Sequence, residues 1–178
     1  MNKLLARPEP LELNHEAAML RITQALGETA ISQVRELFRE YANTPGVSPC
    51  WQDFDRELAS LPGRYSPPEG RLLLAHRAEP GKSEGLVGCV AMHKLEEGIC
   101  EMKRLYVRTE FRGEGAGRKL TETLIAEARS IGYGKIRLDT LPIMGQAQQL
   151  YRVLGFREIP AYQKDPTPGA LYFELDLR

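Results

Sequence analysis

The sequence has few cysteines and no long apolar run, and both deficits narrow the class of protein. No stretch approaches the roughly 18 consecutive apolar residues that a membrane-spanning helix requires. The three cysteines, Cys50, Cys89 and Cys100, are an odd number and lack C-x-x-C spacing. This pattern argues against a disulfide framework and against a zinc site, and we expect the cysteines to be small buried apolar residues.

An excess of charge of either sign is also absent. Lys plus Arg and Asp plus Glu number 24 each among the 178 residues. Such a chain has no overall field that attracts nucleic acid or an anionic membrane surface, so any affinity for phosphate must be local. The three histidines are scattered without the spacing of metal ligands, and we expect no metal. The first ten residues hold too short an apolar stretch for a secretory signal, so we expect a cytoplasmic protein.

Proline and periodicity divide the chain into two parts. Residues 1–18 contain Pro8 and Pro10 without sustained periodicity, and we expect an extension that is disordered or lies along the surface. Residues 19–178 are expected to form one α/β domain. Apolar periodicity predicts helices near 27–41, 51–61, 120–131 and 146–154, and strands near 20–23, 72–76, 86–93, 99–107, 135–140, 156–159 and 170–177.

The apolar pattern slips by one residue within 99–107. Cys100 and Met102 share one face of this strand, and the same phase would continue at Arg104, yet the next apolar residues are Leu105 and Val107. A β-bulge produces such a slip and leaves backbone groups unpaired, which the amides of a ligand can then bind. An exposed strand with imperfect alternation explains the same pattern, so both interpretations stay open at this point.

A glycine-rich segment between two arginines follows this strand. It reads Arg112-Gly113-Glu114-Gly115-Ala116-Gly117-Arg118 and precedes an amphipathic helix. Closely spaced N–H groups without a Cβ, together with the positive end of the helix dipole, suit an anion with several oxygens such as a diphosphate. A surface turn that requires positive φ is the alternative. The strand at 135–140 completes a βαβ unit, whose ligands bind at the C-terminal strand ends.

Two short motifs connect these segments to a known family. One reads Arg or Gln, two residues, Gly, one residue, Gly or Ala, and the other reads Ala-x-x-Leu-Tyr followed by Gly-Phe. The residues that match them are Arg112, Gly115 and Gly117, then Ala147, Leu150, Tyr151, Gly155 and Phe156. Through these motifs the chain resembles the GNAT superfamily of N-acetyltransferases over about residues 19–178. The resemblance implies an α/β (α+β) fold with a mixed, mostly antiparallel sheet of six to seven strands, about four flanking helices, and central strands that splay apart to receive acetyl-CoA.

Carried over to the matching positions, the resemblance implies a binding site for acetyl-CoA. Backbone groups after the phase slip would pair with the pantetheine amides, and the glycine-rich segment would hold the pyrophosphate with Arg118 or Lys119 close to it. Where many members have an asparagine this chain has Met144, so that contact is either lost or made by Gln146. The implied cofactor-binding residues are Leu105, Tyr106, Val107, Arg112, Gly113, Glu114, Gly115, Ala116, Gly117, Arg118, Gln146 and Tyr151.

Acetyl transfer to an amine needs a neutral amine, a donor to the developing oxyanion and a proton for the departing thiolate. The resemblance implies that Tyr151 supplies this proton, although the spacing of Tyr151 is also that of a core residue. Glu101 matches a glutamate that acts in some members as a base, directly or through water, and a strand carboxylate paired with Lys103 is the alternative. A bulge would free the N–H of Leu105 to donate to the oxyanion.

The sequence says least about the molecule that accepts the acetyl group. The resemblance places it between the loops 43–51 and 161–169, where Trp51, Tyr65 and Tyr162 either line a pocket or pack as core or rim residues. We expect a small-molecule partner, a primary amine or an amino acid, that attacks directly in a ternary complex on a monomer or homodimer. The alternatives are a noncatalytic acyl-CoA-binding sensor or interaction module, and a peptide or protein N-acetyltransferase.

Overall fold

The computed structural model describes residues 19–47, 51–78 and 83–178, so the expected extension at 1–18 lies outside the described residues. Each helix and strand that periodicity predicts is present, with ends shifted by a few residues. No helix in the described part is long and apolar enough to cross a membrane.

The strands are β1 (Met19–Gln24), β2 (Arg71–Ala78), β3 (Gly85–Glu96), β4 (Ile99–Val107), β5 (Lys135–Thr140), β6 (Arg157–Ile159) and β7 (Leu171–Asp176). The helices are α1 (Gly27–Ala42), α2 (Trp51–Ser60), α3 (Ala116–Ile131) and α4 (Gly145–Val153), with short 3-10 helices η1 (Gly63–Tyr65) and η2 (Thr109–Phe111).

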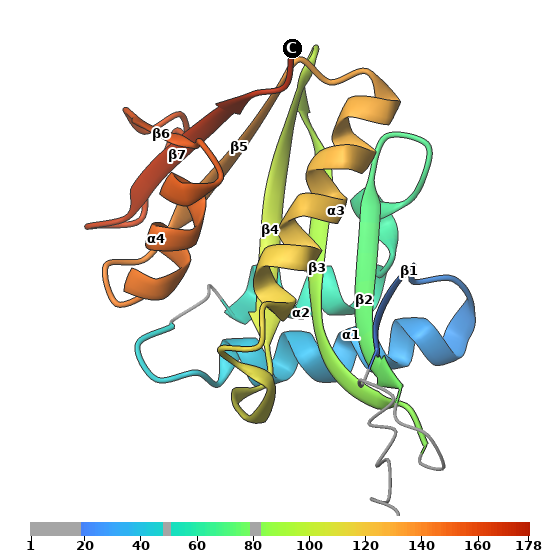
Figure 1. The fold of residues 1–178 in the computed structure, drawn as a ribbon. Coiled ribbons are helices and arrows are strands. Elements are labelled where there is room, and N and C mark those ends of the chain that lie inside the picture. Colours follow the sequence, from blue (N-terminus) through green and yellow to red (C-terminus); the bar gives the residue numbers. More distant parts are fainter. Residues whose placement is uncertain (1–18, 48–50, 79–82) are drawn as a thin grey trace, which may run out of the picture.

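The strands form one mixed sheet in the order β1-β2-β3-β4-β5-β7-β6. Among these neighbours only β4 and β5 run parallel, and they pair only from Ile99 to Glu101 against Lys135 to Arg137. Beyond these residues the two strands separate, which opens the middle of the sheet (Figure 1). The expected mostly antiparallel sheet of six to seven strands, with splayed central strands and about four helices, is therefore confirmed.

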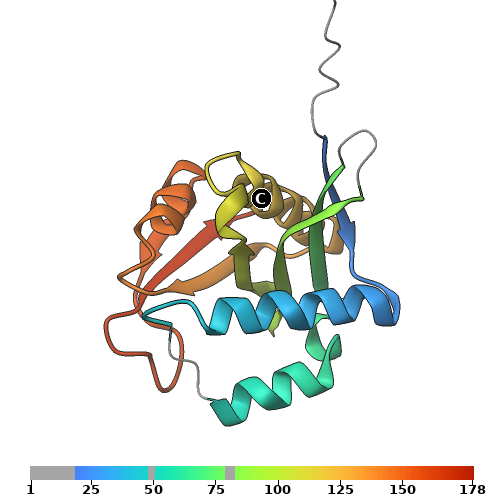
Figure 2. The same ribbon diagram turned by 90° about the horizontal axis from the view of Figure 1, so that it is seen from below.

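Helices cover both faces of the sheet. Figures 1 and 2 show α3 and α4 on one face and α1 and α2 on the other. The apolar stripe of α3, which includes Leu120 and Leu124, packs into one buried cluster, and the stripe of α1, which includes Val34 and Phe38, packs into a second. Burying each of these side chains stabilises the fold by about 2 kcal/mol relative to exposure. The two faces thus have separate cores with the opening of the sheet between them.

The phase slip in β4 is a β-bulge. Along β3 the pairing advances two residues from Cys89 to Ala91, while along β4 it covers three, from Tyr106 to Lys103. Arg104, inside this stretch, has φ of 58°, which is uncommon for a residue other than glycine. The extra residue lets the consecutive side chains of Lys103 and Arg104 line the same cavity instead of pointing to opposite faces. Of the two interpretations of the sequence pattern, the bulge is confirmed.

Candidate active site

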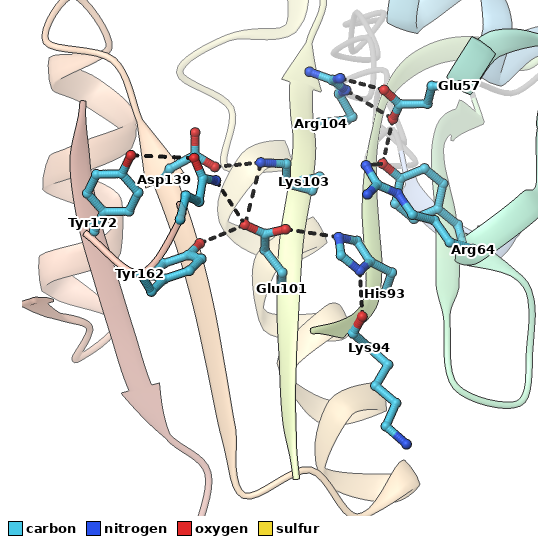
Figure 3. A network of polar contacts seen from close by, with 12 residues as sticks. Glu57, Arg64, His93, Lys94, Glu101, Lys103, Arg104, Asp139, Tyr162 and Tyr172 are labelled. Carbon is cyan, nitrogen blue, oxygen red and sulfur yellow. Dashed lines mark hydrogen bonds and ion pairs between the residues drawn. The ribbon is translucent and has the colours of Figure 1, made fainter. Parts of the chain in front are cut away.

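Charged side chains bridge the opening where β4 and β5 separate. Two residues beyond the last paired position on each strand, Lys103 and Asp139 approach each other. The Nζ of Lys103 donates to Oδ1 of Asp139 at 2.6 Å (Figure 3). These side chains are 17% and 21% exposed, so both are in reach of solvent. The opening is therefore not filled by apolar side chains at this point, and its charged groups are accessible to a ligand.

Unpaired backbone borders the same opening on β4. Tyr106 and Val107 pair with β3 on one side, but neither has a partner on β5, and Leu105 has no register partner on either strand. Backbone N–H and C=O groups are strong hydrogen-bonding groups, and an edge inside a sheet is a template for an added extended chain. The structure thus places the three predicted pantetheine-binding residues along one open strand edge.

The glycine-rich segment forms the turn between η2 and α3. Gly113 and Gly115 have φ of 83° and 84°, a left-handed conformation that glycine adopts without steric cost. Gly115 is the N-cap of α3, no side chain caps this helix, and its first turn has no acidic residue. The first N–H groups of α3 therefore have no carboxylate competing for them, as binding of a diphosphate requires.

One residue of this turn, Glu114, carries the wrong charge for binding an anion. Arg77 of β2 offsets it, because Nη1 of Arg77 donates to Oε2 of Glu114 at 2.6 Å. The flanking arginines have partners of their own: Arg112 donates to the carbonyl oxygen of Val107 at 2.9 Å, and Arg118 pairs with Glu122 at 2.8 Å. Sequence reasoning missed Arg77, since no local signal connects residue 77 to a turn 37 positions away.

Tyr151 lies on α4 between the rings of Phe156 and Phe173, with ring centroids 5.7 and 6.1 Å away. It is 5% exposed, and burial raises the pKa of its hydroxyl, so the proton is held at neutral pH. Within the described part of the chain no protein group forms a hydrogen bond with this hydroxyl. Tyr151 is thus both a core residue, as its spacing predicts, and a protonated donor without a protein acceptor. Gln146, the other α4 candidate, is exposed.

Glu101 is held by several donors at once. Its Oε2 lies 2.9 Å from Nε2 of His93, and its Oε1 accepts from the Tyr162 hydroxyl at 2.7 Å (Figure 3). The ammonium group of Lys103 lies 3.5 Å from Oε1. Burial by itself raises the pKa of this carboxyl, but the hydrogen bond from His93, the charge of Lys103 and the bond from Tyr162 lower it to about 2. Glu101 is therefore ionised at neutral pH and already engaged by protein donors.

Two polar contacts fix the orientation of the His93 ring. Nδ1 lies 2.7 Å from the carbonyl oxygen of Lys94, and Nε2 faces the Glu101 carboxylate. The His93 ring therefore connects the backbone of β3 with the Glu101 carboxylate on β4. Tyr162 reaches the same carboxylate from the loop between β6 and β7, so Glu101 joins three separate parts of the chain.

A second ion pair connects the bulge to α2. Nε of Arg104 donates to Oε1 of Glu57 at 3.2 Å, and Nη2 of Arg104 donates to Oε2. The guanidinium also lies over the rings of Tyr41 and Phe54, at 5.6 and 5.5 Å from the centroids. Burial by itself raises the pKa of Glu57, but the bonds and charge of Arg104 hold it below its usual range. Sequence reasoning did not select Arg104, although the phase slip was the signal that marked it.

A cavity of about 710 Å³ lies on the α2 side of the opening. The wall that the sequence predicted on loop 161–169 is present, since Gln163 and Thr167 line the cavity. The opposite wall, among the described residues, is formed by α2 and η1, and residues 48–50 of loop 43–51 lie outside the described residues. Tyr65 lines the cavity but is 1% exposed, and the side chain of Trp51 lies outside the described residues. Its lining residues are Asp53, Phe54, Arg56, Glu57, Ser60, Leu61, Pro62, Gly63, Arg64, Tyr65, Lys103, Arg104, Asp139, Gln163 and Thr167.

The two cysteines that the structure describes, Cys89 and Cys100, do not line this site, and Cys50 lies outside the described residues. Cys89 and Cys100 are buried, as expected of small apolar side chains, and burial raises the pKa of both thiols, that of Cys100 to about 12. A thiol that keeps its proton is a poor nucleophile, so neither Cys89 nor Cys100 is suited to accept the acyl group. Among residues 19–47, 51–78 and 83–178, no three His, Cys, Asp or Glu side chains are grouped to hold a metal ion.

A family model, a relative in sequence and two solved structures all relate this chain to acetyltransferases. The model of the family described as acetyltransferase (GNAT) matches residues 31–156. An uncharacterized N-acetyltransferase of Schizosaccharomyces pombe is 37% identical over 148 residues, which cover 83% of this chain and 88% of that protein. An acetyltransferase of the GNAT family from Staphylococcus aureus Mu50 has a similar structure, with a TM-score of 0.74 at 19% identity over 90% of this chain and 100% of that one. The structure of yncA from Salmonella typhimurium with its cofactor acetyl-CoA has a TM-score of 0.67 at 20% identity over 89% of this chain and 94% of that one.

Proposed function

Because the chain belongs to the GNAT acetyltransferase family and is an N-acetyltransferase, we propose that it transfers the acetyl group of acetyl-CoA to a primary amine of a small molecule or an amino acid. The amine attacks directly in a ternary complex. The observation that carries this proposal is the opening between β4 and β5, which has an unpaired strand edge on β4 and a cavity of about 710 Å³ beside it. Two ligands that must react can therefore meet in one place.

The donor side of the opening suits acetyl-CoA. We propose that backbone groups of Leu105, Tyr106 and Val107 pair with the pantetheine amides and that the N–H groups of residues 112–117 bind the diphosphate. The free edge of β4 and the uncapped start of α3 support this assignment. The yncA structure, whose fold this chain shares, contains acetyl-CoA. The exposed Gln146 and Arg118 lie at the starts of the two helices that flank this ligand and are proposed as further contacts.

Tyr151 is the proposed acid of the reaction. The amine attacks the thioester carbonyl and forms a tetrahedral oxyanion. As this species collapses, the C–S bond breaks and the departing thiolate takes the Tyr151 proton. The attacking nitrogen releases one proton to water, and Tyr151 regains its proton from water before the next turnover. A donor for this step must be protonated at neutral pH and must not be bonded to another acceptor, and the buried hydroxyl of Tyr151 meets both conditions. The N–H of Leu105, in the bulge, is the proposed donor to the developing oxyanion.

Of the two roles expected for Glu101, its surroundings favour the structural one. A general base needs an open lone pair and a pKa near the working pH, whereas the carboxyl of Glu101 has a pKa of about 2 and accepts bonds from His93 and Tyr162. We therefore propose that Glu101 positions Tyr162 and Lys103 beside the opening. A thioester is already activated, so holding the amine in line with it supplies a large part of the rate.

The experiment that tests the function is a turnover screen. Acetyl-CoA is mixed with the protein and with amino acids, polyamines, aminoglycosides and peptides, and the released CoA thiol is measured. Thiol release with a small amine, together with an N-acetylated product identified by mass, supports the proposal. Turnover confined to peptides would favour the peptide N-acetyltransferase instead. If acetyl-CoA raises the thermal midpoint of unfolding yet no amine releases thiol, the noncatalytic sensor is the better explanation.

A further inference from the structure

All but one of the described charged side chains that line the cavity beside the opening form an ion pair with another lining residue. Four cations and three carboxylates line it among the described residues. They form the pairs Arg104 with Glu57, Lys103 with Asp139, and Arg56 with Asp53. Within the described part of the chain, Arg64 alone among these lining groups has no carboxylate at ion-pair distance. Among the described residues, the lining thus includes one guanidinium without a carboxylate of its own at ion-pair distance.

The guanidinium of Arg64 is held in place by its neighbour. Its Nη2 donates to the hydroxyl of Tyr65 at 3.1 Å, and its Cζ lies 5.2 Å from the centroid of that ring. The Tyr65 hydroxyl in turn donates to Oε1 of Glu57, which also accepts from Arg104, so Arg64 is linked through Tyr65 to α2 and the bulge. Figure 3 shows Arg64, Glu57 and Arg104 in this cluster. A guanidinium that is partly positioned in advance loses less conformational entropy when it binds an anion.

We propose that the acceptor of the acetyl group is an amine that also carries a carboxylate, and that Arg64 binds this carboxylate. The inference rests on the proposed function and adds the chemical class of its acceptor. A planar guanidinium matches a carboxylate through two parallel N–H···O bonds. Arg64 and the Lys103–Asp139 pair line the same cavity, so an amino acid bound at Arg64 spans it with its amine directed to the opening. Polycationic amines fit poorly, because cations outnumber carboxylates among the described residues of the lining.

Matched acceptors test this assignment on the intact protein. Glycine, β-alanine and 4-aminobutyrate are each compared with the corresponding amide, which keeps the amine and the shape but lacks the charge. We expect the best amino acid to have a KM at least about tenfold below that of its amide, because hydrogen bonds between two charged groups are stronger than those to a neutral amide. The separation of amine and carboxylate that gives the lowest KM measures the span of the cavity.

Variants of Arg64 test whether this residue causes the preference for acids over amides. Arg64→Ala should abolish the difference between acid and amide while leaving KM for acetyl-CoA unchanged, and Arg64→Lys should restore part of it. Arg157→Ala is the control, because Arg157 is exposed on β6 and does not line the cavity. Equal KM values for acids and amides in the wild type, or a loss in Arg64→Ala that affects both alike, overturn the inference and leave the acetyl transfer standing. Absence of turnover with any amine overturns the proposed function, and the inference with it.

Discussion

Arg104 donates to both carboxylate oxygens of Glu57, so a residue with left-handed backbone in the middle of β4 is tied to helix α2. The side chains of the pair are 16% and 10% exposed. This ion pair joins the β4 bulge to helix α2 at the edge of the cavity. The same ion pair connects the bulge, in which Leu105 has no register partner, with the helix that lines the cavity.

Loss of one partner of this pair should destabilise the protein. Arg104→Ala leaves the Glu57 carboxylate nearly buried without its cation, so we expect the free energy of unfolding to fall by about 3 kcal/mol. Urea denaturation measures this change. Arg157→Ala, at an exposed position, should change the free energy by no more than about 0.5 kcal/mol. If Arg104→Ala is as stable as Arg157→Ala, the ion pair has no structural role.

The glycine turn should be sensitive to a single Cβ. Gly115 has φ of 84° at the N-cap of α3, and Gly132 has φ of 101° at its C-cap, and a Cβ added at either position would meet no atom within 4 Å. An alanine costs roughly 1–2 kcal/mol of backbone strain in this region. Both Gly115→Ala and Gly132→Ala should therefore lower the thermal midpoint of unfolding, but only Gly115→Ala should raise KM for acetyl-CoA.

Steady-state kinetics of the two variants check this prediction. An equal rise in KM for acetyl-CoA in both would show that the turn acts through stability alone. An unchanged KM in Gly115→Ala would remove the turn from the diphosphate site.

Removal of the Tyr151 hydroxyl should affect chemistry more than folding. Since no described protein group bonds this hydroxyl, Tyr151→Phe should keep the thermal midpoint of unfolding near that of the wild type. The turnover number kcat should fall by about 10²- to 10⁴-fold if Tyr151 supplies the proton. Tyr133→Phe provides the converse control, because the buried Tyr133 donates to the carbonyl oxygen of Glu69 at 2.9 Å.

The two tyrosine variants should therefore show opposite patterns. Tyr133→Phe is expected to lose about 1 kcal/mol of stability while kcat stays unchanged. Unaltered kcat in Tyr151→Phe on the best acceptor would refute the assignment of Tyr151 as the acid.

Protonation of Glu101 should contribute to unfolding in acid. Its pKa falls from 4.5 to about 2 in the folded protein, so the folded state prefers the ionised form. The stability that this preference supplies is present above pH 4.5 and is lost as the pH falls through 4.5 towards 2. Glu101→Gln cannot titrate, so its free energy of unfolding should depend less on pH across that window. Parallel pH profiles for the wild type and Glu101→Gln, from urea denaturation, would contradict the assignment.

Much of the fold follows from local patterns. The alternation of apolar residues with periods of 2 and 3.6 predicts each helix and strand, because those periods decide which side chains one face can bury. The phase slip at Lys103 and Arg104 predicts the bulge for the same reason. The predicted roles of Tyr151, Glu101 and Leu105 stay predictions, although the structure brings all three to the strands and helix that surround the opening.

The sequence by itself determined the helices and strands and the resemblance to the family, and it marked the positions of the bulge and the glycine turn, since each of these signals depends on residues a few positions apart. Only the tertiary structure decided the partners of the charges. Arg77 meets Glu114 across 37 positions, Arg104 meets Glu57 across 47, and Tyr162 meets Glu101 across 61. Such pairs depend on strand register and helix docking, which no local spacing encodes. The same long-range packing leaves Arg64 without a carboxylate at ion-pair distance in the described chain, so the proposal of a carboxylate-bearing acceptor depends on the folded protein.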